Sequence, residues 1–279
     1  MRCDSHVHIV GPTDRYPQVP NRTYLAGIAT VEELESNAAP NDVRRFVIVQ
    51  PSFYGTDNRL LLQSLDVLAG RSRGVAVIDQ TASRQTLSGF VAQGVRGFRL
   101  NLYSRIGDDT PLDIRFRAIE EPAHAANCHI EVIAPLKMLA ENAALLAHSR
   151  VPVVIDHYGI YSGHKPDDAE GRALLDLLLL PHVWIKLSAP YRNSTDDLAT
   201  RPDPDWLAAI LAVASARCVW GSDWPHTPPH TVQMGSDLHA PYRRLPYRAV
   251  LDGFIAAIGS IELAERILSD NPERLYEFQ

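Results

Sequence analysis

The stretch Cys3-Asp-Ser-His-Val-His-Ile-Val-Gly-Pro12 decides between two folds that the rest of the chain would otherwise allow. It predicts a first strand, and the alternating strands and helices after it suit either an open doubly wound sheet or a closed barrel. A doubly wound sheet usually carries a glycine-rich phosphate turn directly after its first strand, and this stretch has no such turn. We therefore expect the barrel.

Eight apolar runs of strand length recur along the chain, and helical patterns follow them. The runs are rich in β-branched residues and hardly alternate, which is typical of parallel strands buried on both faces. Eight such units predict a single-domain (β/α)8 TIM barrel over residues 1–279. The predicted strands are 3–8, 45–50, 74–79, 95–102, 129–134, 151–156, 183–188 and 218–223. The predicted helices are 31–38, 57–69, 82–93, 113–127, one ending at 148, 169–180, 205–216, and a closing helix from 261 ended by a turn at Asn271-Pro272.

The composition is that of an ordinary soluble globular protein, with 46% hydrophobic and 22% charged residues. The net charge of −6 includes no basic block, which argues against nucleic acid or an anionic membrane as partner. No run approaches the roughly 20 apolar residues of a membrane span, and no secretory signal precedes the first strand, so we expect a cytoplasmic protein. The three cysteines lack metal or disulfide spacing and are expected to be buried.

Polar residues finish three of the predicted strands, where a barrel places its active site. His6 and His8 lie one residue apart on a strand, so both point to the same side. His157 follows Asp156 at the end of another strand, and Asp223 ends the last one. Each has an ordinary structural explanation, since an aspartate can cap a helix and a histidine can bond a carbonyl or lie on a solvent face. Their convergence at one mouth instead indicates a catalytic site.

Three segments are similar to the amidohydrolase superfamily: Asp4-Ser-His-Val-His8, Val153-Val-Ile-Asp-His-Tyr-Gly159 and Trp220-Gly-Ser-Asp-Trp-Pro-His226. The chain most resembles the 2-pyrone-4,6-dicarboxylate lactonase-like branch, which is related to sugar lactonases and to 4-sulfomuconolactone hydrolase. The resemblance covers nearly the whole chain, and it implies a hydrolase that opens a cyclic ester. Further segments that carry it are 10–14, 49–58, 94–101, 188–192 and 271–276.

Ester hydrolysis needs a water made nucleophilic and a carbonyl oxygen stabilised as it gains charge. Asp223 is the expected general base. We expect His6, His8 and His157 to polarise the carbonyl, either by hydrogen bonds or by holding one divalent metal as a Lewis acid.

Two cofactor states stay open for these four residues. Three imidazoles and one carboxylate match the ligand types of a single zinc ion. A second metal is not expected, because the fourth strand carries Arg99 and Asn101 and the fifth strand has no imidazole where many superfamily members hold one. The resemblance also implies that the same residues can act with no metal.

Three arginines near the same mouth indicate an anionic substrate. Arg99 lies toward the end of the fourth strand, Arg105 in the loop after it and Arg192 in the loop after the seventh strand. Guanidinium groups bind carboxylates in a forked geometry, so these residues predict a small acidic lactone with carboxylates or a sulfonate. The alternative is that each arginine pairs with a surface acid such as Asp108 or Asp196.

Other residues carry weaker signals. By resemblance, Tyr24 matches a tyrosine that contacts the substrate, whereas Ile133 stands where the family has another tyrosine, which bears on the identity of the ring. His226 lies three residues past Asp223 and could reach the mouth, although loop histidines are usually solvated. Further residues that could line the pocket are Ser52, Tyr54 and Asn101.

We therefore expect a lactone hydrolase acting on a small acidic lactone. The rivals are a sugar-acid lactone isomerase, a metal-dependent decarboxylase of the same superfamily and a non-catalytic binding protein on the same scaffold. Only hydrolysis must incorporate solvent oxygen, and only the decarboxylase must release carbon dioxide. The oligomeric state is not predicted.

Overall fold

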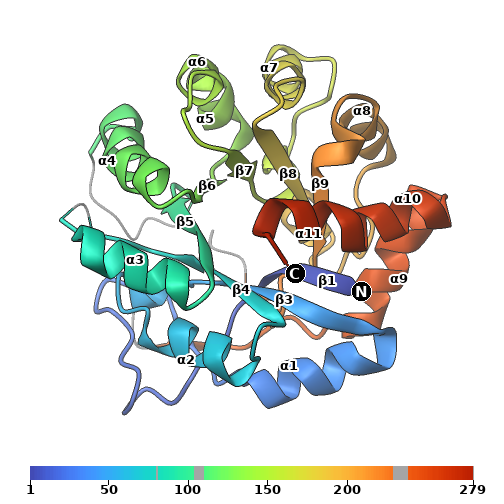
Figure 1. Ribbon diagram of the computed structural model, residues 1–279. Helices are drawn as coiled ribbons and strands as arrows, with labels where there is room; N and C mark the ends of the chain where they lie inside the picture. The colour runs from blue at the N-terminus through green and yellow to red at the C-terminus, as the bar shows by residue number, and fades with distance from the viewer. Residues whose placement is uncertain (80, 104–109, 229–237, 279) are drawn as a thin grey trace.

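The computed structural model describes residues 1–79, 81–103, 110–228 and 238–278. Within these residues, one eight-stranded parallel sheet curls into a barrel with helices around it (Figure 1). The His8 N–H donates to the Trp224 carbonyl at 2.8 Å, which joins the last strand to the first and confirms the predicted (β/α)8 barrel. In sheet order the strands are β1 (Arg2–Val7), β3 (Val43–Val49), β4 (Ser72–Ala76), β5 (Val95–Asn101), β6 (His129–Ile133), β7 (Val153–Ile155), β8 (Val183–Ser188) and β9 (Cys218–Gly221).

The barrel buries two apolar cores because successive side chains of a strand point to opposite sides. On β7, Val153 and Ile155 pack outward under the helices, whereas Val154 points into the barrel. The side chains that we call the barrel floor close the interior at the N-terminal ends of the strands. The barrel floor consists of Cys3, Trp184, Tyr276 and Phe278.

Several helices begin at a side-chain cap. Thr30 accepts the Glu33 N–H at 3.2 Å while the Glu33 carboxylate accepts the Thr30 N–H at 3.0 Å, which is a capping box. The helices are α1 (Val31–Ala38), α2 (Arg59–Val67), α3 (Arg84–Ala92), α4 (Leu112–Ala125), α5 (Leu136–Glu141), α6 (Ala143–Ala147), α7 (Ala169–Leu178), α8 (Pro204–Ala214), α9 (Tyr247–Ile258), α10 (Ile261–Glu265) and α11 (Asn271–Tyr276). Of these, the helices with a side-chain cap are α1, α3, α7, α8 and α10. The short helical turns are η1 (Ala39–Asn41), η2 (Ser52–Tyr54), η3 (His157–Gly159), η4 (Pro190–Asn193), η5 (Ser215–Arg217) and η6 (Arg266–Asp270).

Two helical segments differ from the prediction. The helix predicted to end at 148 divides into α5 and α6 at Asn142, whose side-chain amide donates to the Met138 carbonyl at 2.9 Å. Asn271 begins α11 instead of marking a terminal turn, because its amide donates to the Cys218 carbonyl at 2.7 Å and ties the closing helix to β9. The predicted helices after the other strands are present, with bounds shifted by a few residues.

A small parallel pair connects two loops beside the mouth of the barrel. It joins β2 (Leu25–Ala26), in the long first loop, to β10 (His239–Ala240), after β9. The Tyr242 hydroxyl also donates to the Gly27 carbonyl. These contacts hold the first loop, and with it Tyr24, next to the loop that follows Asp223. In the described ranges, no helix has the length and apolar character needed to cross a membrane.

Candidate active site

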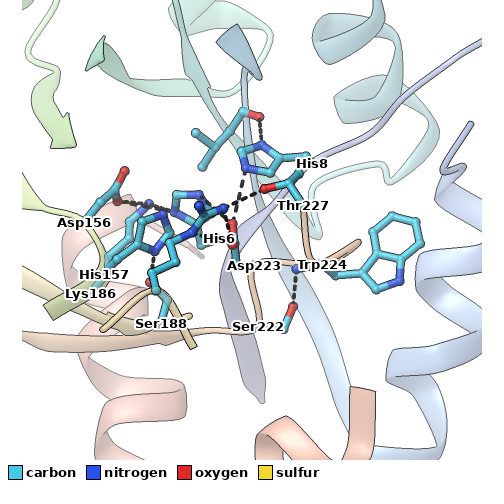
Figure 2. Close-up of polar contacts among 12 residues, drawn as sticks. His6, His8, Asp156, His157, Lys186, Ser188, Ser222, Asp223, Trp224 and Thr227 are labelled. Carbon is cyan, nitrogen blue, oxygen red and sulfur yellow. Dashed lines mark hydrogen bonds and ion pairs between the residues drawn. The ribbon is translucent and has the colours of Figure 1, made fainter. Parts of the chain in front are cut away.

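The four residues predicted to carry the chemistry meet at the C-terminal ends of the strands. His6 belongs to β1, His8 follows it, and His157 and Asp223 follow β7 and β9. Figure 2 shows their side chains pointing into one space. A Cβ atom on Gly221 would lie 2.6 Å from the His6 Cβ, so only glycine lets β9 approach β1 this closely. We call these four residues the catalytic mouth.

The backbone at the catalytic mouth adopts conformations that most residues avoid. His157, Asp223 and His226 have φ values of 53°, 59° and 67°, in the left-handed region. Such conformations cost about 1–3 kcal/mol each and persist where surrounding contacts hold them, often at functional sites. Here the Asp223 N–H donates to the His6 carbonyl at 2.9 Å, and the His226 N–H donates to the Asp223 carbonyl at 2.7 Å.

Asp4 fastens β1 from behind the catalytic mouth. Its buried carboxylate accepts the Ser222 N–H at 2.8 Å and the Tyr247 hydroxyl at 2.9 Å. Burial raises the pKa of Asp4 to about 6 in spite of these hydrogen bonds. β1 departs from regular register after Asp4, and His6 faces the interior while Asp4 faces α9. The Asp4 carboxylate thus connects β1, near the N-terminus, to the segment after β9 and to α9, near the C-terminus.

The carboxylate of Asp223 is held at one oxygen only. Its Oδ2 accepts the Tyr191 hydroxyl at 2.6 Å and the Arg192 Nη2–H at 2.8 Å. Its Oδ1 has no hydrogen-bond partner among the described residues and lies 3.6 Å from His6 Nε2 and 3.5 Å from His8 Nε2. Burial would raise the pKa of Asp223, but Arg192 and the nearby imidazoles hold it well below its usual value. Asp223 is therefore a buried anion with one oxygen that has no hydrogen-bond partner among the described residues.

His6 and His8 both bring Nε2 close to Asp223, and their other ring nitrogens have different neighbours. The His8 Nδ1–H donates to the Val49 carbonyl at 2.7 Å, so the neutral ring carries a lone pair on Nε2. His6 Nδ1 lies between a donor and an acceptor, since the Lys186 ammonium is 3.2 Å away and Asp156 Oδ1 is 3.3 Å away. A hydrogen bond from Lys186 places the His6 proton on Nε2, whereas a hydrogen bond to Asp156 places it on Nδ1.

His157 completes the catalytic mouth from the β7 side. Its Nδ1 lies 2.8 Å from the Ser188 hydroxyl, and its ring centroid is 4.7 Å from that of His6. Burial lowers the pKa of His157 to about 3, and it lowers the pKa of His6 well below the usual value. Both rings are therefore neutral near pH 7.

Beneath the histidines lies a cluster of buried charges that the sequence interpretation missed. Lys186 on β8 contacts the Glu131 carboxylate and lies 3.6 Å from Asp156 Oδ1, and all three side chains are fully buried. We call these three residues the ionic layer. The sequence contained a signal for it. Lys186 is a charged residue within an otherwise apolar strand, and it lies on the same face of β8 as Ser188 because alternate residues of a strand share a face.

The predicted substrate-binding arginines have protein partners in this structure. Arg192 is bound to Asp223 and to the Thr227 hydroxyl. Arg99 donates to the Gln50 carbonyl at 2.9 Å and lies 3.6 Å from Asp156 Oδ2. Their role toward a substrate stays a prediction, and Arg105 lies outside the described residues.

The other predicted lining residues lie around the same mouth. Tyr24 is buried against Phe53, with ring centroids 6.1 Å apart. The Tyr54 hydroxyl accepts the Gly11 N–H at 3.1 Å, so it holds the first loop. Asn101 Oδ1 accepts the Tyr103 N–H at 3.0 Å, and Ser52 is partly buried at the start of η2.

His226 is buried instead of solvated, in contrast to most loop histidines. It is 2% exposed, and neither ring nitrogen has a hydrogen-bond partner among the described residues. Its ring stands edge-on to Tyr191, with centroids 6.1 Å apart. The three cysteines are free and buried, as predicted.

The four predicted metal ligands do not form one site. His6, His8 and Asp223 have ligand atoms within 4.8 Å of one another, whereas His157 groups with His6 and Asp156. A metal-bound imidazole normally donates its second N–H to an acceptor, as His8 does. His6 Nδ1 lies 3.3 Å from the Asp156 carboxylate, which is such an acceptor, and 3.2 Å from the Lys186 ammonium, which is not. By their spacing, His6, His8 and Asp223 could hold one divalent ion, which would supply a Lewis acid for the carbonyl.

Comparison with known proteins gives relatives over nearly the whole chain. The 4-sulfomuconolactone hydrolase of Hydrogenophaga intermedia is 29% identical over 98% of this chain and 88% of its own. The 2-pyrone-4,6-dicarboxylate hydrolase of Comamonas testosteroni is 29% identical over 98% of this chain and 89% of its own. The D-galactarolactone isomerase of Agrobacterium fabrum is 28% identical over 66% of this chain and 62% of its own.

A solved structure agrees with these relatives. The crystal structure of a probable 2-pyrone-4,6-dicarboxylic acid hydrolase from Acinetobacter baumannii, with citric acid bound, has a TM-score of 0.81 and 26% identity over 99% of both chains. A family model described as amidohydrolase matches residues 3–278. The chain belongs to the amidohydrolase family.

Proposed function

We propose that this protein is a hydrolase that opens the ring of a small anionic lactone. The observation that carries the proposal is Oδ1 of ionised Asp223, which has no hydrogen-bond partner among the described residues and is flanked by the Nε2 atoms of His6 and His8. Two relatives named as hydrolases of a pyrone dicarboxylate and a sulfomuconolactone support this reaction class.

The geometry supports the following mechanism. A water near Asp223 Oδ1 and His8 Nε2 meets two acceptors, so both of its protons are held and its lone pair faces the substrate. Asp223 removes one proton as the water oxygen bonds to the lactone carbonyl carbon. The His6 Nε2–H donates to the carbonyl oxygen as it gains charge. Collapse of the tetrahedral intermediate breaks the ring C–O bond, and the proton passes from Asp223 to the departing ring oxygen.

The reaction is proposed to proceed without a metal. The contact between Lys186 and His6 supports this, because a hydrogen bond from the ammonium to His6 Nδ1 would keep the ring proton on Nε2 and leave no lone pair there for a metal. Equal activity before and after removal of bound metal by a chelator, with metal content measured in both samples, is the expected result. Loss of activity with the metal and recovery on adding zinc back would contradict it.

An acidic substrate is supported by the charges around the mouth. Arg192 is paired with Asp223 and Arg99 lies 3.6 Å from Asp156, so two buried guanidinium groups lie close to the catalytic mouth. The related Acinetobacter protein with citric acid bound supports a site that accepts several carboxylates. We therefore propose carboxylates or a sulfonate on the lactone.

The first test is an Asp223→Asn variant on a panel of acidic pyrones, muconolactones and sugar-acid lactones. We expect kcat to fall by roughly 10²–10⁴-fold, the usual contribution of a general base. Asp66→Asn, which alters an exposed aspartate on α2, is the matched control. An Asp223→Asn protein that opened lactones at the parent rate would overturn the assignment.

A sugar-acid lactone isomerase is the second candidate, and the similarity to the galactarolactone isomerase favours it. In that reaction a substrate hydroxyl takes the place of the water. Product formed in ¹⁸O-labelled water separates the two, because hydrolysis adds one solvent oxygen to each product molecule and isomerisation adds none.

A further inference from the structure

A cavity of about 360 Å³ opens between the loops that follow the barrel strands. Tyr191 and Arg192, which both hold Asp223, form part of its wall. Arg243 reaches the cavity from the loop after β9, and Lys137 reaches it from the start of α5. Arg243 lies in none of the motifs that the sequence analysis identified.

Arg243 is connected to Asp223 through Tyr191. Its guanidinium lies 4.4 Å from the centre of the Tyr191 ring. The hydroxyl at the other end of that ring donates to Asp223. One tyrosine therefore separates Arg243 from the general base. The Arg243 backbone N–H also donates to the His226 carbonyl at 2.9 Å, which fixes the loop.

The guanidinium of Arg243 retains unused donors, unlike that of Arg192. Its Nη1 donates to the Thr227 carbonyl, but its Nε is buried with no hydrogen-bond partner among the described residues. The only carboxylate recorded near it there is Asp197, at 3.6 Å, and the Asp197 side chain is 70% exposed. Such an exposed pair is weak, and a buried unpaired donor is costly. A ligand oxygen could replace Asp197 at Nη2.

The charge of the cavity wall selects the ligand. Among the described residues, the cavity wall holds the cations Arg192, Arg243 and Lys137 and one carboxylate, that of Asp197. We propose that Arg243 binds a carboxylate or sulfonate of the substrate and so determines selectivity for acidic over neutral lactones. The inference rests on the proposed lactonase function. It assigns to Arg243 the contact that sequence reasoning gave to Arg192.

The test compares Arg243→Met, which keeps an apolar chain over Tyr191, with Arg244→Met, which removes an exposed neighbouring charge. Each variant is assayed with an acidic muconolactone and a neutral aldonolactone. For Arg243→Met we expect the ratio of kcat/KM for the acidic over the neutral substrate to fall about 10- to 100-fold, mainly through KM, as for a lost charged hydrogen bond. Arg243→Lys should recover part of this ratio, and Arg244→Met should leave it unchanged.

An equal fall on both substrates, or no fall in the ratio, would overturn the inference. Far-UV circular dichroism and melting temperature show whether each variant is folded. Citrate binding by calorimetry gives a readout that does not depend on turnover, and we expect weaker binding by Arg243→Met alone. If the parent protein opened no lactone, the proposed function would fail, whereas citrate binding would still test Arg243 as an anion ligand.

Discussion

Trp184 and Lys186 both point into the barrel from β8, yet one belongs to the barrel floor and the other to the ionic layer. Both regions are buried, so burial alone does not distinguish them. The barrel floor packs aromatic and apolar groups, whereas the ionic layer places a cation between two carboxylates and an imidazole. The difference shows that the interior is divided along the strand direction, with stability concentrated below and chemistry above.

Breaking the ionic layer should have the largest effect. Lys186→Met leaves Glu131 and Asp156 buried without their cation, which should cost about 3–5 kcal/mol of unfolding free energy. The substitution also removes the contact between Lys186 and His6 Nδ1. Loss of a partner that orients a site residue typically costs 10- to 100-fold in activity, so kcat should fall by about that factor. Urea unfolding and steady-state kinetics measure the two effects.

A double variant separates the two roles of Lys186. Adding Glu131→Gln to Lys186→Met removes one of the unpaired charges, so part of the stability should return while kcat stays low. Recovery of kcat together with stability would mean that Lys186 acts only on folding and does not position His6.

Opening the barrel floor should affect stability alone. Phe278 lies under the guanidinium groups of Arg45 and Arg73, at 5.0 and 4.6 Å. Phe278→Ala should cost about 3 kcal/mol through the lost packing and cation–π contacts, with kcat within twofold of the parent. Leu179→Ala, at a position 60% exposed, is the control for loss of an apolar side chain. If folded Phe278→Ala protein showed a large fall in kcat, the conclusion that the barrel floor contributes only to stability would be wrong.

Acid should lower the unfolding free energy through two buried histidines. His129 lies 4.0 Å from Glu131, and His226 lies beside Tyr191. Burial lowers the pKa of His129 to about 3 and that of His226 to about 4. Below about pH 6.5 the unfolded chain binds more protons than the folded chain, so stability is complete above that pH and is lost as pH falls toward the folded pKa values. At pH 5 each of these histidines should cost about 2 kcal/mol relative to pH 7.

The contribution of His226 can be measured by comparing how the unfolding free energies of the parent and of a His226 variant change with pH. The unfolding free energy of His226→Gln should fall between pH 7 and pH 5 by about 2 kcal/mol less than that of the parent. An identical fall in both proteins would show that His226 does not titrate on unfolding as its burial requires.

Most of the fold could be predicted because parallel strands buried on both faces leave a simple pattern of apolar runs. The ends of those runs also located His6, His157 and Asp223, since strand ends in a barrel converge. Helix division at Asn142 and the start of α11 at Asn271 depend on single side-chain hydrogen bonds, which no periodic pattern encodes.

The partners of the site residues were harder to predict. Lys186 and Glu131 lie inside apolar runs, and their importance follows from the register of β6, β7 and β8, which sequence alone does not specify. Arg243 belongs to a long connection, and its place over Tyr191 depends on contacts with Thr227 and His226. Arg192 was placed correctly at the mouth, but its bond to Asp223 is a tertiary contact between two loops.

The hydrogen bonds between β1 and the segment after β9 have a consequence for how the protein acquires activity. His6 and Asp223 come from opposite ends of the chain, and the seam that closes the ring also brings them together. Contacts between such distant segments tend to form slowly because a long loop must be closed first. Neither half of the polypeptide carries a working centre, so enzymatic turnover during refolding would report the completion of the ring itself.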